Sequence, residues 1–204
     1  MDSLNPVQRR IHQAALRLFA AKGISQLNIS DLAQEAGVAR GTIYNNIETM
    51  ESLFEQVASQ LSAEMHERVK SSFEGLDDPA QRLAHGIRFF VRRTHEDPHW
   101  GAFMCRFAMS NASLREMFYS QATVDLLHGL GSGRYQFRQK QMVSVLTLIA
   151  TSVLGAMMLV REGLKTWREA GSDMAEIVLR ALGVSPDEAR ALSVTELPVL
   201  APTG

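Results

Sequence analysis

Five residues near the start of the chain could make hydrogen bonds to another molecule, although none is a recognisable catalytic acid, base or nucleophile. They lie within six consecutive positions, as Arg40, Gly41, Thr42, Tyr44 and Asn45. Arginine and asparagine side chains can read the edges of nucleic-acid bases, and threonine and tyrosine hydroxyls can reach phosphates. The chemistry that this segment offers is therefore recognition, and its most specific target would be DNA.

A short helix over residues 39–46, placed after a tight turn, would position this cluster. Ala33, Gly37 and Ile43 stand four and six residues apart: a small residue lets two helices cross closely, the glycine makes the turn, and the β-branched residue fills the space between the helices. Ile43 and Ile47 would face the interior, because so short a helix is not stable in water without a buried side. The spacing predicts a helix-turn-helix, although an ordinary helical hairpin can show the same pattern.

The rest of the chain is predicted to be helical as well, because apolar residues recur at helical spacing and no stretch alternates as a strand would. Asn5 and Pro6 predict the start of a first helix and Gly23 its end, while Asn28 and Gly37 are suited to cap a second helix. We expect further helices at 49–73, 79–95, 98–109, 113–128, 136–168, 172–183 and 186–193, with a flexible connector at 129–134. The predicted fold class is all-α.

Composition limits the function classes further. The chain has 204 residues, 46% of them hydrophobic, which is enough for a sizeable core. Its net charge of -1 excludes a polycation that binds nucleic acid with its whole surface, whereas residues 1–47 carry a net charge of +2. Cys105 is the single cysteine and the first residues lack the apolar run of a signal peptide, so we expect a cytoplasmic protein.

Residues 11–53 closely resemble the N-terminal domain of the TetR family of transcriptional repressors. The matching motifs are "AALRLF", the glycine that follows it, "ISDLAQEAGV" and "GTIY". The resemblance implies a three-helix helix-turn-helix DNA-binding domain, residues 1–48, and a larger helical ligand-binding and dimerisation domain, residues 49–204. It also implies a ligand-responsive homodimer that binds a palindromic double-stranded DNA operator and is released by a small-molecule effector. Activation of transcription is the alternative to repression.

Carried onto this sequence, the resemblance implies that six residues face DNA: Asn28, Arg40, Gly41, Thr42, Tyr44 and Asn45. The chain departs from the family at Ile47, where an aromatic residue is common, and at Met50, where a lysine is common. Because methionine cannot contact a phosphate through a charge, we expect weaker DNA binding with a flatter salt dependence. Arg9 and Arg10 could replace the missing contact, or they could be ordinary solvated arginines.

Aromatic and methionine side chains in the second part of the chain predict an apolar interior that could bind a hydrophobic or aromatic effector. Ordinary core packing is the alternative for each of them. The candidate lining residues are Phe90, Trp100, Phe103, Met104, Phe107, Met117 and Met158, together with Phe118. The candidate polar anchors are His85, Cys105, Arg106 and His128.

Residues 142–160 contain no charged residue and are long enough to cross a bilayer. A helix packed between other helices is the interpretation we favour, because small residues at spacings of three and four would allow a second helix to approach closely. The family resemblance implies a dimer formed as a four-helix bundle by the last two long helices of each subunit, without a membrane span. The candidate dimer residues are Ser144, Thr151, Gly155, Ile177, Val178 and Ala181.

Two other functions compete with a DNA-binding regulator. An enzyme would need an arrangement of catalytic groups that the sequence does not show, and His95 and His99, interrupted by Pro98, make only a poor metal site. A helical interaction module that keeps the fold but has weakened operator binding is the second alternative, because of Ile47 and Met50. We expect no enzymatic activity, no cofactor and no metal.

Overall fold

The computed structural model describes residues 4–199, and within this range all regular structure is helical. The prediction of an all-α fold is therefore confirmed. The elements are α1 (Pro6–Lys22), α2 (Ile29–Ala36), α3 (Arg40–Tyr44), α4 (Met50–Ser71), α5 (Pro79–Glu96), α6 (Pro98–Phe107), α7 (Ala112–Gly131), a 3₁₀ turn at Gln139–Gln141, α8 (Met142–Arg161), α9 (Trp167–Ala181) and α10 (Pro186–Ser193).

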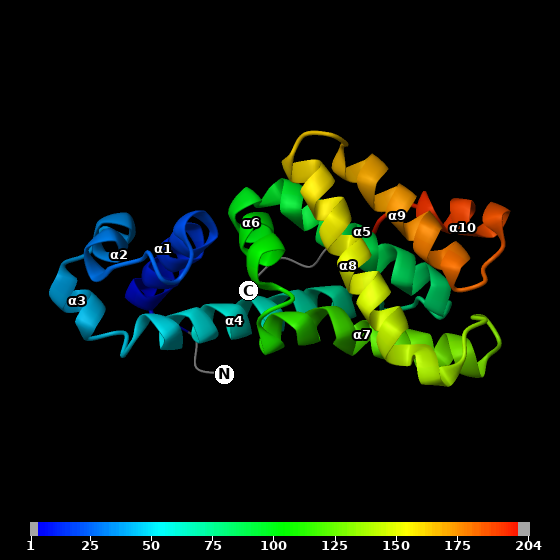
Figure 1. Cartoon of the computed structure of the whole chain (residues 1–204), viewed down its shortest axis with the longest axis horizontal. Helices are drawn as coiled ribbons and strands as arrows, with labels where there is room; N and C mark the ends of the chain where they lie inside the picture. Colours follow the sequence, from blue (N-terminus) through cyan, green and yellow to red (C-terminus); the bar gives the residue numbers. More distant parts are fainter. Residues whose placement is uncertain (1–3, 200–204) are drawn as a thin grey trace.

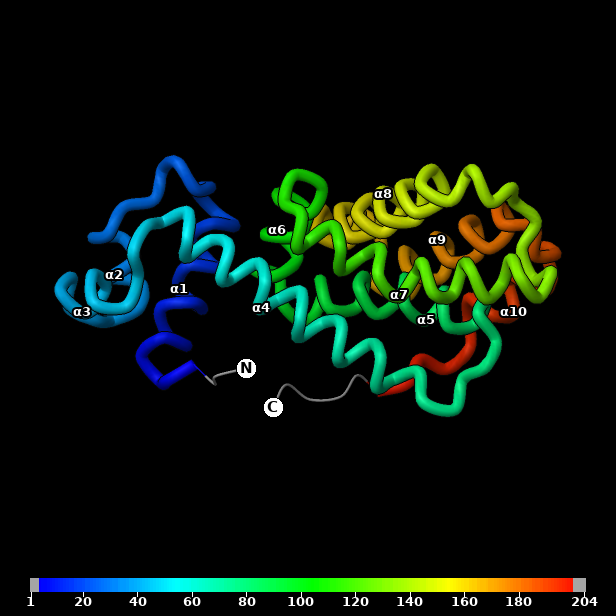
Figure 2. The backbone as a smooth tube through the Cα atoms, turned by 90° about the horizontal axis from the view of Figure 1, so that it is seen from below, coloured from blue at the N-terminus to red at the C-terminus, as the bar shows by residue number. Residues whose placement is uncertain are grey.

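The helices form a small head and a larger body that α4 connects. The head consists of α1, α2 and α3 at one end of the molecule, and the body consists of α5 to α10 at the other (Figure 1). Helix α4 begins beside α3 and runs along the body next to α7, as the view from below shows (Figure 2). Helix α5 lies in the middle of the body, because it packs against α6, α7, α8, α9 and α10.

The first two helices begin and end where their capping residues predict. The side chains of Asn5 and Asn28 accept hydrogen bonds from backbone amides in the first turns of α1 and α2. Gly23 follows α1 with a φ of 83°, and Gly37 follows α2 in the left-handed conformation, with a φ of 62°. A residue with a Cβ atom is strained in that region of φ, so glycine at position 37 allows the tight turn into α3.

The prediction for the second half of the body is wrong in three places. The single helix expected over 136–168 is shorter, because α8 spans 142–161 and Gly163, with a φ of 70°, follows it. Helix α9 then begins at Trp167 and not at 172, because Thr166 and Glu169 form a capping box at its start. Helix α7 continues to Gly131, so the first part of the expected connector at 129–134 is helical.

An aromatic cluster joins the head to the body. Phe103 of α6 is fully buried, and the centroid of its ring lies 6.5 Å from that of Phe19 in α1 and 5.5 Å from that of Phe54 in α4. Phe107 adds a fourth ring, 5.1 Å from Phe103 and 4.9 Å from Phe54. Because three helices contribute to this cluster, the head and the body share a hydrophobic core.

An arginine makes a second connection between α6 and α1. The guanidinium of Arg106 donates hydrogen bonds of 3.4, 3.3 and 3.4 Å to the carbonyl oxygens of Ala20, Ala21 and Lys22. These carbonyls have no partner within the helix, and they lie at its negative end, so a cation is well placed there. The position of α1 therefore depends directly on that of α6.

Two buried side chains of α5 hold the segment that follows α10. Arg88 Nη1 donates a 2.7 Å hydrogen bond to the carbonyl oxygen of Thr195, and His85 Nε2 lies 2.9 Å from the Thr195 hydroxyl. Both side chains are buried, with exposed fractions of 7% and 1%. Burial, with a smaller effect of the Arg88 charge, lowers the pKa of His85 to about 4. His85 is therefore neutral at pH 7.

The pKa of His85 makes the folded protein sensitive to acid. An unfolded histidine has a pKa of about 6.5, so between pH 6.5 and pH 4 the unfolded state binds more protons and the free energy of unfolding falls as the pH falls. We expect His85 to account for a loss of about 2 kcal/mol between pH 7 and pH 5. Urea unfolding of the wild type and of His85→Gln at both pH values measures this loss. Equal losses in the wild type and in His85→Gln would contradict the assignment of this loss to His85. The control is His99→Gln, which replaces an exposed histidine.

Candidate functional site

The polar residues of α3 lie on the outer surface of the head. Ile43 is fully buried and fixes one side of α3 against the core of the head. The helix ends at Tyr44, short of the predicted 46, and Ile47, which follows it, is 8% exposed. The opposite side carries the predicted DNA-facing residues: Arg40, Gly41 and Asn45 are exposed, Thr42 is half-buried, and Tyr44 is 66% exposed. Asn28 is also exposed, at the start of α2. The structure therefore brings most of the predicted DNA-facing residues together on one helix, with Asn28 apart from them.

Arg10 has a structural role in the turn between α2 and α3. Its Nη2 atom donates hydrogen bonds of 2.7 Å to the carbonyl oxygen of Ala36 and 2.6 Å to that of Gly37. Arg10 is an exposed residue, and its Nη2 atom also binds the end of α2. A contact of its guanidinium with phosphate stays a prediction. Arg9 is exposed. Arg10 thus helps to set the angle at which α3 leaves the turn.

Met50, the residue that replaces a lysine common in the family, is the first residue of α4 and is half-buried against the core. Thr49 caps the helix by accepting a hydrogen bond from the backbone amide of Ser52 at 3.0 Å. The start of α4 is thus well formed but carries no positive charge, since Glu51 is the charged residue of its first turn.

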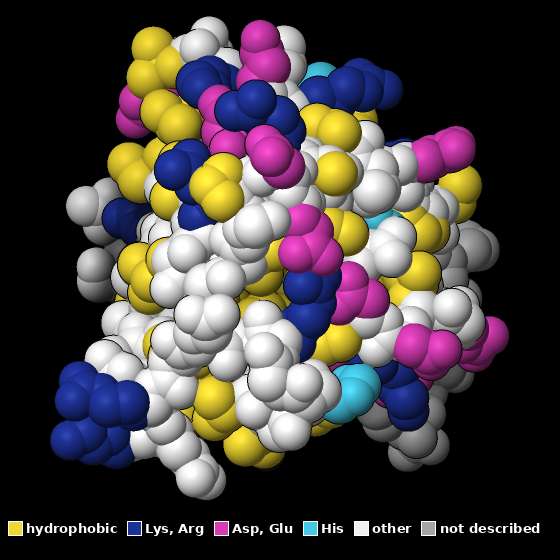
Figure 3. Space-filling model, turned by 90° about the vertical axis from the view of Figure 1, so that its right-hand side faces the viewer, with side chains coloured by type: hydrophobic (Ala, Val, Ile, Leu, Met, Phe, Trp, Pro, Cys, Tyr) yellow, Lys and Arg dark blue, Asp and Glu magenta, His cyan; other side chains and the backbone are white. Residues whose placement is uncertain are grey.

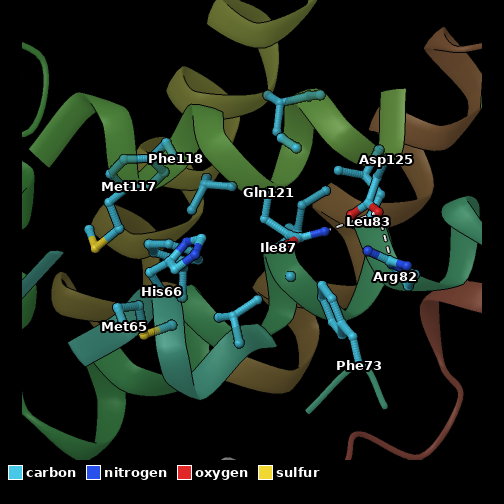
Figure 4. A pocket seen from close by; sticks show the side chains of 16 residues that line it. Met65, His66, Phe73, Arg82, Leu83, Ile87, Met117, Phe118, Gln121 and Asp125 are labelled. Atoms are coloured by element: carbon cyan, nitrogen blue, oxygen red, sulfur yellow. Dashed lines mark hydrogen bonds and ion pairs between the residues drawn. The ribbon is translucent and has the colours of Figure 1, made fainter. Parts of the chain in front are cut away.

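A narrow cavity of about 40 Å³ lies inside the body, between α4, α5, α7 and α8. Its walls are mostly apolar, and Phe90 and Phe118 stack there with ring centroids 4.6 Å apart and planes 28° from parallel. Phe90 and Met117 were predicted to line such a cavity, and both do. Five further side chains that surround the space in Figure 4 were not predicted from the sequence: Met65, His66, Arg82, Gln121 and Asp125.

The polar groups of the cavity gather mainly at one end. Asp125 of α7 is 2% exposed, and its Oδ1 atom lies 2.8 Å from Arg82 Nε and 3.3 Å from Gln121 Nε2 (Figure 4). Burial raises the pKa of Asp125 to about 6, and the charge of Arg82 opposes that shift. The guanidinium of Arg82 also lies over the ring of Phe73, 5.3 Å from its centroid. His66 lines the other end, 3.3 Å from the hydroxyl of Ser120.

Several residues predicted to line the cavity lie elsewhere. Trp100, Phe103, Met104 and Phe107 belong to the packing of α6, and Phe103 and Phe107 form the aromatic cluster that joins the head to the body. Met158 is 48% exposed on α8. Helical spacing identified the buried α6 residues correctly, but it could not show what they are buried against. The predicted polar anchors His85, Cys105, Arg106 and His128 also lie outside the cavity wall.

The outer faces of α8 and α9 expose apolar and small side chains. Ser144, Thr151 and Ala181 are exposed, Gly155 is half-buried and Ile177 is 57% exposed. Val178 is an exception: it is 1% exposed and packs inside its own body, so its assignment to a subunit contact is wrong. The apolar surface extends along α8 to Val143, Leu148 and Met158.

Helix α8 with the preceding turn, Gln139–Arg161, is long and apolar enough to cross a membrane, and a third of its most apolar window is buried.

The end of the body remote from the head differs from the apolar face of α8 and α9. Acidic and basic side chains alternate there with hydrophobic ones (Figure 3). Arg134, for example, forms ion pairs of 3.0 Å with Asp78 and 2.8 Å with Glu188. That end of the body is consequently no continuous basic surface.

Comparison with known families agrees with this architecture. Residues 11–57 match the family of bacterial regulatory proteins of the TetR type, and residues 78–194, more than half of the chain, match the tetracycline repressor-like C-terminal domain. The chain belongs to the TetR family. The first match covers the helix-turn-helix and the start of α4, and the second covers the helices that form the cavity and the exposed α8–α9 face, apart from α4.

Individual TetR-family proteins are similar to this chain over most of its length or over about a third of it. The structure of RolR in complex with resorcinol has 27% sequence identity and a TM-score of 0.74, and the alignment covers 96% of both chains. FadR of Bacillus subtilis in complex with stearoyl-CoA shares the fold, with 21% identity, a TM-score of 0.71 and coverage of 87% of this chain and 98% of FadR. The fatty acid metabolism regulator protein of Bacillus subtilis is 35% identical over 74 residues, which cover 34% of this chain and 38% of that relative.

A second curated relative from the same organism, the uncharacterised regulator YvdT, is 30% identical over 69 residues, which cover 36% of its length. The chain thus matches little more than a third of either curated relative.

TetR-family regulators are soluble proteins that bind DNA and small-molecule effectors, are typically dimers and are typically not enzymes. In the part of the chain that the structure describes, no three His, Cys, Asp or Glu side chains come together as a metal site.

Proposed function

We propose that this TetR-family regulator is a homodimeric repressor that binds a palindromic operator with α3 and leaves it when a small apolar or aromatic ligand enters the cavity. The observation that carries this proposal is the arrangement of α3, whose apolar side is buried at Ile43 while its polar side is exposed; Ile47, just after the helix, is buried as well. A helix that buries one side to be stable and presents hydrogen-bonding groups on the other is suited to the major groove. We assign residues 1–48 to DNA binding and residues 49–204 to ligand binding and dimerisation.

In the proposed complex Arg40 and Asn45 read base edges, and the hydroxyls of Thr42 and Tyr44 contact phosphates. The space beside Gly41 is open in the free protein, since a Cβ atom at this position would have no neighbour within 4 Å. Glycine itself leaves this space unfilled. That open space would let the DNA backbone or a base edge approach the helix closely. Asn28 would place the start of α2 near the backbone, where free amides at a helix start favour a phosphate.

The exposed faces of α8 and α9 support the proposed dimer. Pairing with the same face of a second copy would bury Ile177 and the small residues Ser144, Thr151, Gly155 and Ala181, which permit close helix packing. Such pairing also accounts for the apolar surface of α8 without a membrane, so we propose a cytoplasmic location. A twofold axis would place the two α3 helices about one turn of DNA apart, roughly 34–36 Å.

Effector binding would act on the head through α6. RolR, which is 27% identical, was crystallised with the aromatic compound resorcinol, and this supports an aromatic ligand for the present chain. A ligand that widens the cavity would move α4 or α5, and α6 follows α5 directly along the chain. Arg106 and Phe103 would pass that movement to α1. The ligand can favour release only if it binds the released conformation more tightly.

Selection of duplexes from a random DNA library at a fixed salt concentration tests the proposal and supplies the operator. Arg40→Ala is then expected to weaken binding to the selected duplex about 10- to 100-fold, because one arginine–base contact contributes about 1–3 kcal/mol of discrimination. Fluorescence anisotropy with a labelled duplex measures this change. The control is Arg190→Ala, which removes another exposed arginine, from α10 in the body.

An unchanged affinity of the Arg40→Ala protein would contradict the assignment of α3 to DNA. It would favour the alternative that the chain is an interaction module with weakened operator binding, for which the uncharged Met50 at the start of α4 is the supporting observation. If a selected duplex is bound but saturating ligand leaves its affinity unchanged, the repressor keeps its operator and the proposed release by ligand fails.

A further inference from the structure

Hydrogen bonds are incomplete at the polar end of the cavity, and this bears on the chemistry of the effector. The contacts of the Asp125 carboxylate to Arg82 and to Gln121 both fall on Oδ1. Oδ2 accepts no hydrogen bond from the residues that the structure describes. Arg82 Nε, although 2.8 Å from Oδ1, is a buried nitrogen without a hydrogen bond of acceptable geometry in the same part of the chain.

A buried polar group without a partner is unfavourable by about 1–3 kcal/mol, so a ligand that supplies a partner for Arg82 Nε gains affinity there. A hydroxyl group can do both tasks, because it donates one hydrogen bond and accepts others. It would donate to Oδ2 of Asp125 and accept from the guanidinium of Arg82 or the amide of Gln121. A ligand with only apolar groups would leave Arg82 Nε unpaired and would make no hydrogen bond to Oδ2 of Asp125.

The charges at this end disfavour an ionic ligand. Asp125 and Arg82 form an ion pair, so their sum is close to zero, and both line a space with otherwise mainly apolar walls. A carboxylate ligand would be repelled by Asp125, and an ammonium ligand would be repelled by Arg82. Either ion would also lose its hydration without gaining a new counter-charge, which is expensive in an apolar interior.

The walls favour a small flat ring. Phe90 and Phe118 already stack against each other, and an aromatic ligand can continue such a stack. The present volume of about 40 Å³ is too small for a ring, so binding requires the walls to separate. Met65 and Met117 line the side opposite the ion pair in Figure 4, and their unbranched side chains can adapt to a ligand.

We infer that the effector is a neutral aromatic compound that carries a hydroxyl group, and that Asp125 selects this hydroxyl against anionic analogues. The inference rests on the proposed function, because it places the effector in this cavity. It goes further by naming the ligand class and the residue that determines it. Asp125 would be a specificity-determining residue, with Arg82 and Gln121 as its positioning partners.

Isothermal titration calorimetry of the full-length protein without DNA tests the ligand class. The probes are 4-methylphenol, 4-methylbenzoate and p-xylene, which share one ring and differ in one substituent, and the 4-butyl phenol and benzoate extend the series in length. At pH 7 we expect each phenol to bind at least tenfold more tightly than its benzoate and than the hydrocarbon. Benzoates that bind as tightly as the phenols, or phenols that do not bind up to their solubility, would overturn the inference.

Replacement of one carboxylate should reverse the preference. In Asp125→Asn the charge of Arg82 is no longer compensated, so a benzoate can take the place of the missing anion, and we expect it to bind more tightly than the phenol. The matched control is Asp78→Asn, which breaks the ion pair with Arg134 outside the cavity and should leave the preference for phenols unchanged. A preference for phenols in Asp125→Asn equal to that of the wild type would also overturn the inference.

If circular dichroism shows that Asp125→Asn does not fold, Gln121→Leu provides the second test, because it keeps the ion pair and removes one donor. Phenol affinity should then fall several-fold, and an unchanged affinity would argue against the site.

The proposed function and the inferred ligand class can fail separately. Phenols that bind with the expected preference but do not release DNA leave the ligand class intact and contradict the proposed release. If a compound releases the protein from DNA but its binding is insensitive to Asp125→Asn, the proposed release stands and the inferred ligand class fails.

Discussion

Phe103→Ala is expected to lower the free energy of unfolding by about 3–5 kcal/mol, the range measured when a fully buried phenylalanine is truncated. Phe103 has no exposed surface, and its ring packs against Phe19 of α1, Phe54 of α4 and Phe107 of its own helix. Truncation would leave a cavity among three helices that cannot all move to fill it. The loss falls on the junction of head and body, so operator affinity should fall as well.

Urea unfolding followed by circular dichroism measures this loss, and the protein concentration must be fixed because subunit association adds to the stability of a dimer. Tyr44→Ala is the control. It removes an aromatic ring that is 66% exposed, so its effect on stability should remain within about 0.5 kcal/mol. A loss below about 1 kcal/mol for Phe103→Ala would show that the cluster is not a continuous core.

Gly129→Ala is expected to destabilise the protein by on the order of 3 kcal/mol, at the upper end of the range for overpacking by a single methyl group. A Cβ atom at position 129 would lie 2.2 Å from Cδ2 and 2.3 Å from Cε2 of the Tyr135 ring, distances that no packed structure tolerates. Tyr135 is only 2% exposed, so its ring cannot swing away without opening the core. The end of α7 would have to shift, and with it the helix that carries Asp125.

Gly131→Ala is a matched control with an effect of opposite sign. It introduces the same methyl group two residues later in α7, where a Cβ atom meets nothing within 4 Å. Because alanine favours a helix over glycine by up to about 1 kcal/mol, this variant should be slightly more stable than the wild type. Equal stabilities of the two alanine variants, measured by thermal unfolding, would exclude the contact with Tyr135 as the cause.

Local signals in the sequence were sufficient for the head. Asn5, Asn28 and Gly37 set the ends of α1 and α2 through hydrogen bonds and backbone angles that involve only neighbouring residues. The outward face of α3 followed from the positions of Ile43 and Ile47, because a short helix has only two sides to divide between core and solvent.

The body contains a signal of the same kind. Thr166 and Glu169 have the spacing of a capping box, which would have placed the start of α9 correctly and separated it from α8. Apolar periodicity alone cannot show such a break when residues on both sides of it are apolar.

The cavity depends on contacts between residues that are distant in the sequence, and no local pattern predicts such contacts. Arg82 and Asp125 are on different helices, and their ion pair forms only because α5 and α7 pack side by side. Conversely, the spacing of Trp100, Phe103, Met104 and Phe107 predicted burial, and they are wholly or partly buried. Periodicity could not distinguish a wall of a cavity from the core between α6 and α1.

The contact of Arg106 with the last carbonyls of α1 limits how freely this protein could be recombined with its relatives. A hybrid sensor that joins the reading head of another regulator to this body near residue 48 would keep Arg106 and Phe103 but replace their partners on α1. The incoming head would need a first helix that ends at the same place and a large apolar residue at position 19. A hybrid without these features should still bind the ligand of this body. Ligand binding would, however, no longer change the position of the incoming head.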